Sequence, residues 1–104
     1  MNKKSILKHA IKAQKNARAP YSNYLVGAAL ETSGGQIVYG CNIESKAYPT
    51  TLCAERVAIF SAISSGHSSF KWLSVATEDG AYPCGSCRQI IAEYLGEAPI
   101  FIVN

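Results

Sequence analysis

Residues 53–64 read CAERVAIFSAIS, and this stretch decides the fold because apolar side chains occupy nearly every position after its first four. A helix on the surface of a domain carries a single apolar stripe, whereas a helix that is apolar on most sides is buried. We therefore expect a buried helix over 54–64. Gly66 follows it and is the residue type that most often ends a helix.

The residues that precede this helix predict an amphipathic helix and a hairpin. Apolar side chains recur at helical spacing over 3–18 opposite a row of lysines, and Pro20 lies beyond the end of that pattern. Two β-prone runs, 24–32 and 36–43, flank the turn tripeptide Ser33-Gly34-Gly35. This arrangement is typical of an antiparallel β-hairpin.

The residues after the buried helix add two more strands and one more helix. The β-prone runs 70–77 and 100–103 enclose a helix that Pro83 and Cys84 open. Strands joined through a helix run parallel with a right-handed crossover, and ligands gather at the ends of such strands. The order α-β-β-α-β-α-β predicts an α/β fold, a three-layer α/β/α sandwich whose mixed sheet combines an antiparallel hairpin with parallel strands.

Composition limits the classes of function. A chain of 104 residues has room for one domain with a thin margin of stability, which a metal or partner subunits could increase, so we expect a homo-oligomer. The net charge of +3 comes mostly from lysines of the first helix, which we interpret as a solvated face and not as a nucleic-acid surface. We expect a cytoplasmic protein without a membrane partner, because no signal peptide or membrane-length apolar run is present.

The cysteines carry the most informative motif. In a reducing compartment, closely spaced cysteines are metal ligands or redox groups more often than disulfides. Cys53 and Glu55 form Cys-x-Glu, and residues 83–87 form Pro-Cys-x-x-Cys, a pattern that resembles the signature of zinc nucleobase deaminases. Three thiolate ligands from two helix starts, Cys53, Cys84 and Cys87, with a fourth position open to water are typical of a catalytic zinc site.

Charged neighbours of these cysteines suggest further roles. Glu55 lies two residues after Cys53, which suits proton transfer in a hydrolytic deamination better than metal ligation. It could instead serve only the dipole of its helix. Three thiolates leave a zinc site negatively charged, and hydrogen bonds from Arg56 or Arg88 to the sulfurs would withdraw part of that charge. Either arginine could equally be a surface charge.

The chain resembles the small homotetrameric cytidine deaminases over essentially its whole length, and six stretches carry the resemblance. They are APYS at 19–22, VGAAL at 26–30, GCNIE at 40–44, AY at 47–48, CAER at 53–56 and PCGSCRQ at 83–89. The resemblance implies zinc-dependent hydrolysis of cytidine, and of deoxycytidine, to uridine and ammonia in pyrimidine salvage, with one zinc ion per chain. A cysteine as the first ligand, where deoxycytidylate and nucleic-acid editing deaminases have histidine, indicates a free nucleoside as substrate.

The resemblance also implies substrate contacts. Asn42 and Glu44 would hold the ribose hydroxyls, Tyr24 would line the sugar pocket, and the Ala54 amide would approach the base. An amide and a carboxylate two residues apart at a strand end point the same way and can share a sugar diol. The same pair could simply be polar residues at a strand terminus. Cys41 is interpreted as a small buried hydrophobe and not as a fourth ligand.

Three features of the resemblance concern the surroundings of the site. Gln89 would lie with Arg56 beside the metal ligands, and Tyr48 would reach a neighbouring subunit. Family members usually continue past the strand at 100–103 with another strand and a C-terminal segment, so we expect 1–104 to be a single domain that lacks this segment. An exposed edge strand would invite pairing with another chain.

Other functions fit parts of the pattern. Deaminases of nucleoside-like antibiotics such as blasticidin S share the zinc signature, although Asn42 and Glu44 favour ribose. A thiol redox protein would use the cysteines of 84–87 and would leave Cys53 and Glu55 without a role. A structural zinc domain with four cysteine ligands would require Cys41 to coordinate the metal.

Overall fold

A single mixed sheet with helices on both faces forms the protein. The computed structural model describes residues 2–21, 23–44, 53–78 and 85–103, the last range without the side chains of 85–87. Its elements are α1 (Lys3–Gln14), β1 (Gly27–Thr32), β2 (Ile37–Cys41), α2 (Ala54–Ser64), β3 (Phe70–Ala76), α3 (Gly85–Leu95) and β4 (Ile100–Val103). Among the helices of these ranges, none is long and apolar enough to cross a bilayer.

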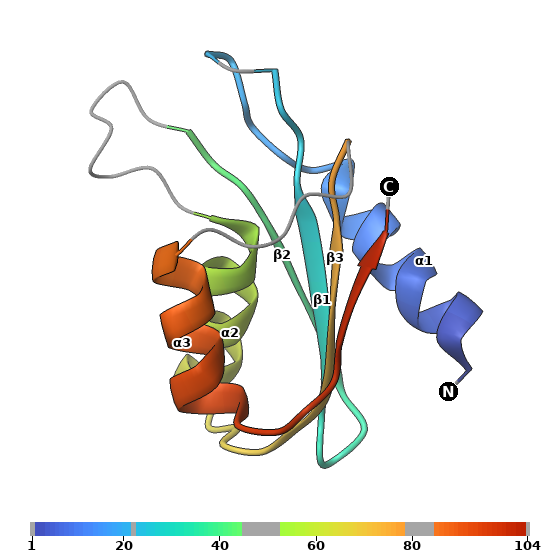
Figure 1. Ribbon diagram of the computed structural model, residues 1–104, viewed down its shortest axis with the longest axis vertical. Coiled ribbons are helices and arrows are strands. Elements are labelled where there is room, and N and C mark those ends of the chain that lie inside the picture. Colours follow the sequence, from blue (N-terminus) through green and yellow to red (C-terminus); the bar gives the residue numbers. More distant parts are fainter. Residues whose placement is uncertain (1, 22, 45–52, 79–84, 104) are drawn as a thin grey trace.

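The predicted three-layer sandwich is confirmed. The strand order is β2-β1-β3-β4, with β1 antiparallel to both β2 and β3, and β3 parallel to β4. Figure 1 shows α1 alone on one face of the sheet and α2 and α3 side by side on the other. The sheet therefore combines an antiparallel hairpin with a parallel pair, as the order of elements predicted.

The buried helix has the predicted bounds, because its end is fixed by a strong local signal. Gly66 has a φ of 94°, a left-handed conformation that favours glycine. The Gly66 amide donates to the Ile63 carbonyl at 3.0 Å, and the His67 amide donates to the Ala62 carbonyl at 3.0 Å. These two bonds form a Schellman motif, which satisfies the last carbonyls of α2.

The prediction of a first helix over 3–18 was too long by one turn, since α1 ends at Gln14. Beyond it the chain pairs with the exit of β2. The Arg18 amide donates to the Asn42 carbonyl at 2.9 Å, and the Glu44 amide donates to the Arg18 carbonyl at 2.8 Å. The amides of residues 15–17 still donate to the carbonyls three residues before them, and only at Arg18 do tertiary hydrogen bonds take over.

The predicted strands 24–32, 36–43 and 70–77 were also too long. The first strand begins only at Gly27, the second ends at Cys41 and the third ends at Ala76. The largest difference is at the start of β1, because the backbone of residues 24–26 makes most of its hydrogen bonds to side chains. In the side chain of Asn42, Nδ2 donates to the Tyr24 carbonyl and Oδ1 accepts from the backbone amide of Val26. Side-chain partners of this kind carry no periodic signal in the sequence.

Two glycines allow the helices to approach the sheet closely. A Cβ atom on Gly27 would overlap the backbone of α1 at Ala10 and Gln14. A Cβ atom on Gly40 would lie 2.5 Å from the Ala58 nitrogen, inside the first turns of α2. Since real Cβ contacts are never that short, both positions require glycine for the observed packing.

The register of the sheet brings several chain segments to one end, here called the Gly27 end. Gly27 pairs with Cys41 on β2 and with Ala76 on β3, and Ala76 pairs with Val103 on β4. Consequently the segment that enters β1, the segments that leave β2 and β3, and the last residue of β4 lie at the same end of the sheet. Gly40 brings the start of α2 to the same end.

Candidate functional site

Cys53 is the N-cap residue of α2. Its backbone is extended, with φ −80° and ψ 146°, and its side chain makes no capping hydrogen bond to the helix amides. The thiol is half-buried and is not part of a disulfide. Because Gly40 packs on Ala54 and Ala58, the first turn of α2 is fixed against the exit of β2. The sulfur is therefore held at the Gly27 end of the sheet.

Glu55 is buried in the first turn of α2, with 5% of its surface exposed. A carboxylate near a helix N-terminus gains about 0.3–1 kcal/mol from the helix dipole, and an exposed side chain obtains that gain without being desolvated. Burying an ionised carboxyl costs several kcal/mol unless polar groups compensate. The burial of Glu55 therefore argues against a role limited to the dipole and favours a functional one.

Arg56 contacts the sulfur of Cys53. Its Nη2 atom donates to Sγ at 3.4 Å, and the guanidinium is half-buried. A cation in hydrogen-bond contact with a sulfur stabilises the thiolate over the thiol and withdraws charge from it. The contact joins adjacent turns of one helix start, since the two residues are three apart.

The other two predicted zinc ligands are described in part. Cys84 lies outside the described residues, and Cys87 lies in the first turn of α3 with its side chain outside them. Among the side chains that are described, no three His, Cys, Asp or Glu residues group closely enough to hold a metal ion. The donor types themselves suit zinc, because three thiolates from two helix starts form a soft, open ligand set.

Asn42 and Tyr24 are brought together at the Gly27 end of the sheet. Asn42 is buried, with 9% exposure, and its Nδ2 atom donates to the Tyr24 carbonyl at 2.7 Å. Its Oδ1 atom accepts from the Val26 amide at 3.0 Å. A side-chain amide has two N–H groups and two lone pairs, so one donor and one acceptor position remain beyond these bonds.

Glu44 makes a different contact from Asn42. Its Oε1 atom accepts from the Tyr21 amide at 3.0 Å, and the residue is half-buried. The Arg18–Ile43 bridge between them holds this strand exit to the chain that follows α1. The two predicted ribose ligands thus lie on one continuous segment, and each also binds the backbone of residues 21–26.

The remaining predicted site residues differ in exposure. Ala54 is fully buried, whereas Arg88 and Gln89 are exposed on α3. Tyr48, predicted to reach another subunit, lies outside the described residues. Cys41 is half-buried, and burial raises the pKa of its thiol, an effect that the Arg18 cation partly offsets. A raised pKa disfavours the thiolate that metal ligation requires.

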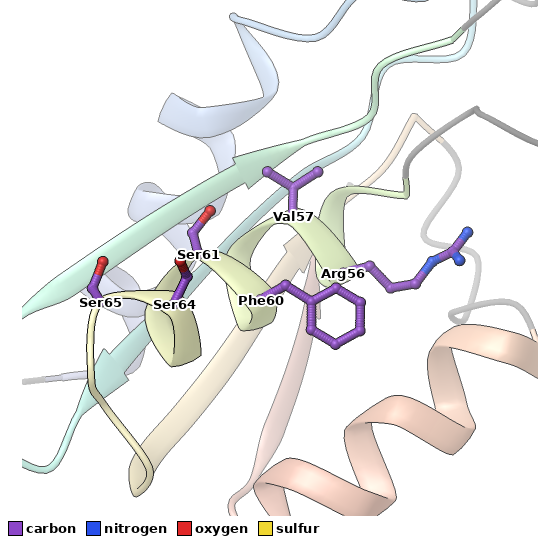
Figure 2. Close-up of a pocket in the computed structure, with 6 residues that line it drawn as sticks. All are labelled: Arg56, Val57, Phe60, Ser61, Ser64 and Ser65. Atoms are coloured by element: carbon purple, nitrogen blue, oxygen red, sulfur yellow. The ribbon is translucent and has the colours of Figure 1, made fainter.

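A groove of about 440 Å³ runs along the outward side of α2. Figure 2 shows its lining, which consists of Arg56, Val57, Phe60, Ser61, Ser64 and Ser65. These residues are one helical face, while Glu55, Ala58 and Ile59 belong to the buried side. The ring of Phe60 meets that of Tyr94 on α3 edge to face at a centroid distance of 6.2 Å. The groove is therefore distinct from the buried side that carries Glu55.

A buried carboxyl and a cysteine thus lie at one helix start, at the Gly27 end of a mixed α/β sheet. The family described as "Cytidine and deoxycytidylate deaminase zinc-binding region" matches residues 1–102. The chain is 47% identical to a cytidine deaminase of Sporosarcina psychrophila, across all of this chain and 79% of that protein. It belongs to the family of cytidine and deoxycytidylate deaminases.

Solved structures agree with this assignment. The crystal structure of cytidine deaminase from Burkholderia pseudomallei matches with a TM-score of 0.87 at 41% identity, over 90% of this chain and 77% of that one. A blasticidin-S deaminase of Bacillus cereus is also similar, with 32% identity over 74% of this chain and 62% of that protein. Sequence and structure therefore agree on the family. The similar proteins include deaminases named for two different substrates, cytidine and blasticidin S.

Proposed function

We propose that the protein catalyses the hydrolytic deamination of cytidine, and of deoxycytidine, to uridine or deoxyuridine and ammonia. The observation that carries the proposal is the burial of Glu55 beside Cys53, because a desolvated carboxyl at a helix start suits proton transfer. Family membership and the names of the similar proteins support the reaction type.

Zinc is the metal that the ligand set favours. Cys53, Cys84 and Cys87 would hold one ion per chain, and zinc bound in this way supplies a Lewis acid that makes hydroxide available near neutral pH. Arg56 at the sulfur of Cys53 would reduce the excess negative charge of three thiolates. Gln89 is assigned to the same surroundings by sequence alone.

Glu55 moves the protons of the reaction. In hydrolytic deamination, water adds to the carbon that carries the amino group, and the bond from that carbon to nitrogen then breaks. The Glu55 carboxylate accepts a proton from water and gives it to the adjacent ring nitrogen. It then carries the second proton to the departing amino group, which leaves as ammonia, so that Glu55 ends in its original state.

The nucleoside is oriented by the segments at the Gly27 end of the sheet. Asn42 and Glu44 would bind the ribose hydroxyls, and Tyr24 would line the sugar pocket. The Ala54 amide would approach the base. Proton transfer then occurs in one fixed geometry, which is the main benefit of positioning.

The first test is the variant Glu55→Gln, which keeps the shape of the side chain and removes its proton exchange. We expect retained zinc and an unchanged melting temperature, with kcat for cytidine lower by about a hundredfold to ten-thousandfold. Metal analysis and ammonia release measure the two effects on the same preparation. The matched control is Glu97→Gln, an exposed position that should leave kcat unchanged. Parent-like turnover by the Glu55 variant would disprove the role.

The same assay decides between the alternative functions. Cytidine, deoxycytidine and blasticidin S are compared as substrates, because a blasticidin-S deaminase is among the similar proteins. Faster release of ammonia from the antibiotic than from cytidine would show that the antibiotic, and not the nucleoside, is the preferred substrate. A preparation without zinc that forms a reversible Cys84–Cys87 disulfide would indicate a thiol redox protein. Zinc retained after Cys41→Ala would exclude a four-cysteine structural site.

The proposal extends to the assembly and setting of the enzyme. A homotetramer would cover the apolar surface of Phe60 and Tyr94, which are 43% and 41% exposed, and Tyr48 would reach the neighbouring subunit. Light scattering should give the mass of four chains, and a monomer at micromolar concentration would contradict it. A reducing cytoplasm would keep the zinc thiolates intact, and pyrimidine salvage would use the product.

A further inference from the structure

The backbone of residues 24–26 is held by side chains from three separate parts of the chain. Asn42, after β2, binds the Tyr24 carbonyl and the Val26 amide. Glu78, after β3, accepts from the Leu25 amide through Oε1 at 3.4 Å. The third partner is Gln14, the last residue of α1, whose Nε2 atom donates to the Leu25 carbonyl at 2.8 Å.

The Gln14 contact is the shorter of the two that hold Leu25. Gln14 is half-buried and belongs to a rigid element, because Gly27 lets α1 pack directly on the start of β1 at Ala10 and Gln14. Glu78 is exposed, and its contact with the Leu25 amide is 0.6 Å longer than that of Gln14. A half-buried donor at hydrogen-bond distance restrains a loop more than a long contact to an exposed side chain.

The residue before this segment ends a turn. Asn23 has a φ of 59°, in the left-handed region that asparagine adopts more readily than most residues other than glycine. Its amide donates to the Ala19 carbonyl at 2.9 Å, which closes the turn ahead of Tyr24. Gln14 and Asn42 hold the backbone on the far side of this turn, so Tyr24 lies at or next to restrained backbone on both sides.

We propose that Gln14 is a positioning residue for nucleoside binding, acting through the Leu25 carbonyl on the placement of Tyr24. The inference rests on the proposed function, in which Tyr24 lines the sugar pocket. It gives α1, which lies on the opposite face of the sheet from α2, a direct connection to substrate binding. Because Gln14 restrains the pocket wall and does not touch the reacting atoms, its loss raises KM and leaves kcat near the parent value.

The experiment compares Gln14→Met with Gln14→Lys in the full-length zinc enzyme. Methionine keeps the length of the side chain without a donor, so KM for cytidine should rise about three- to tenfold with kcat within about twofold. Lysine restores an N–H donor and should return KM to the parent range. Lys15→Met, at the adjacent exposed position, is the control for a general effect of methionine. Melting temperatures of all variants separate a structural effect from a positioning one.

A second readout is independent of turnover. Amide hydrogen exchange of a peptide that covers residues 23–27 should be faster in Gln14→Met than in the parent, while exchange in α2 stays unchanged. Equal exchange and equal KM in the two proteins would overturn the inference. So would a raised KM that Gln14→Lys does not reverse. If the parent fails to deaminate cytidine, the proposed function falls, and the exchange comparison alone still decides whether Gln14 restrains the segment.

Discussion

The two faces of the sheet differ in their polar contacts. On one face, α1 adds polar contacts to a small apolar cluster around Ile6: Ser74 donates from Oγ to the Ile6 carbonyl at 3.0 Å, and His9 Nδ1 lies 2.7 Å from the Tyr39 hydroxyl. On the other face, α2 buries Ala58, Ile59 and other apolar side chains against the strands. Figure 1 shows α1 and α2 on opposite faces of the sheet.

The difference bears on proton transfer and substrate positioning. The α2 face buries a large apolar cluster, and the buried Glu55 lies at the start of its helix. The α1 face is partly open to solvent and contains the exposed Tyr39 ring, with the Lys12 ammonium 5.4 Å from its centroid. In the proposed function α2 carries the group that transfers protons, whereas Gln14 connects α1 to the substrate pocket.

The largest effect on stability is expected inside the α2 face. Ile59 is fully buried, whereas Ile11 on α1 is 40% exposed, so the same substitution tests the two environments. Ile59→Ala should lower the free energy of unfolding by about 2–5 kcal/mol, because it removes buried methylene groups and leaves a cavity. Ile11→Ala should cost less than about 1 kcal/mol. Equal losses in urea denaturation would contradict the contrast between the faces.

The next effect concerns the two glycines that set the helix distances. A methyl group at Gly40 or at Gly27 would meet helix backbone, so Gly40→Ala and Gly27→Ala should each cost about 1–3 kcal/mol. Their effects on catalysis should differ. Gly40→Ala displaces the start of α2 and should lower kcat, whereas Gly27→Ala displaces α1 from residues 24–26 and should raise KM. Steady-state kinetics at a temperature where both variants are folded measures the split.

Much of this arrangement could be predicted from the sequence, because regular elements leave a periodic pattern. The bounds of α2 followed from the apolar run over 54–64 and from Gly66, and the strand at 100–103 was also predicted with its observed bounds. The hairpin followed from the glycine turn at 33–35. These signals are local, so a single sequence is sufficient to recognise them.

The predictions were wrong where tertiary hydrogen bonds ended an element. The pattern of 15–18 is helical, yet Arg18 pairs with Asn42, and residues 24–26 bond to side chains that are distant in the sequence. For the same reason the proposed role of Gln14 could not be predicted, since one glutamine at a helix end has no distinctive spacing. Glu55 could be singled out because its motif is local, but its burial could not be predicted.

The smallest effect is expected at the polar anchor of the α1 face. Ser74 is fully buried, and its hydroxyl lies 3.0 Å from the Ile6 carbonyl and 3.4 Å from that of Ala29. Ser74→Ala removes the donor but leaves carbonyls that also take part in regular backbone bonding, so the loss should be about 0.5–1.5 kcal/mol. Ser64→Ala, at an exposed position on α2, is the control.

The location of that loss distinguishes the two faces more sharply than its size. If Ser74 anchors α1, hydrogen exchange should become faster in the amides of α1 and remain at the parent rate in α2, because local opening follows the contacts of each helix. Exchange that rises equally in both helices would mean that the two faces unfold as one unit. In that case α1 could not move independently of α2, and the separation of substrate positioning from proton transfer would have no structural basis.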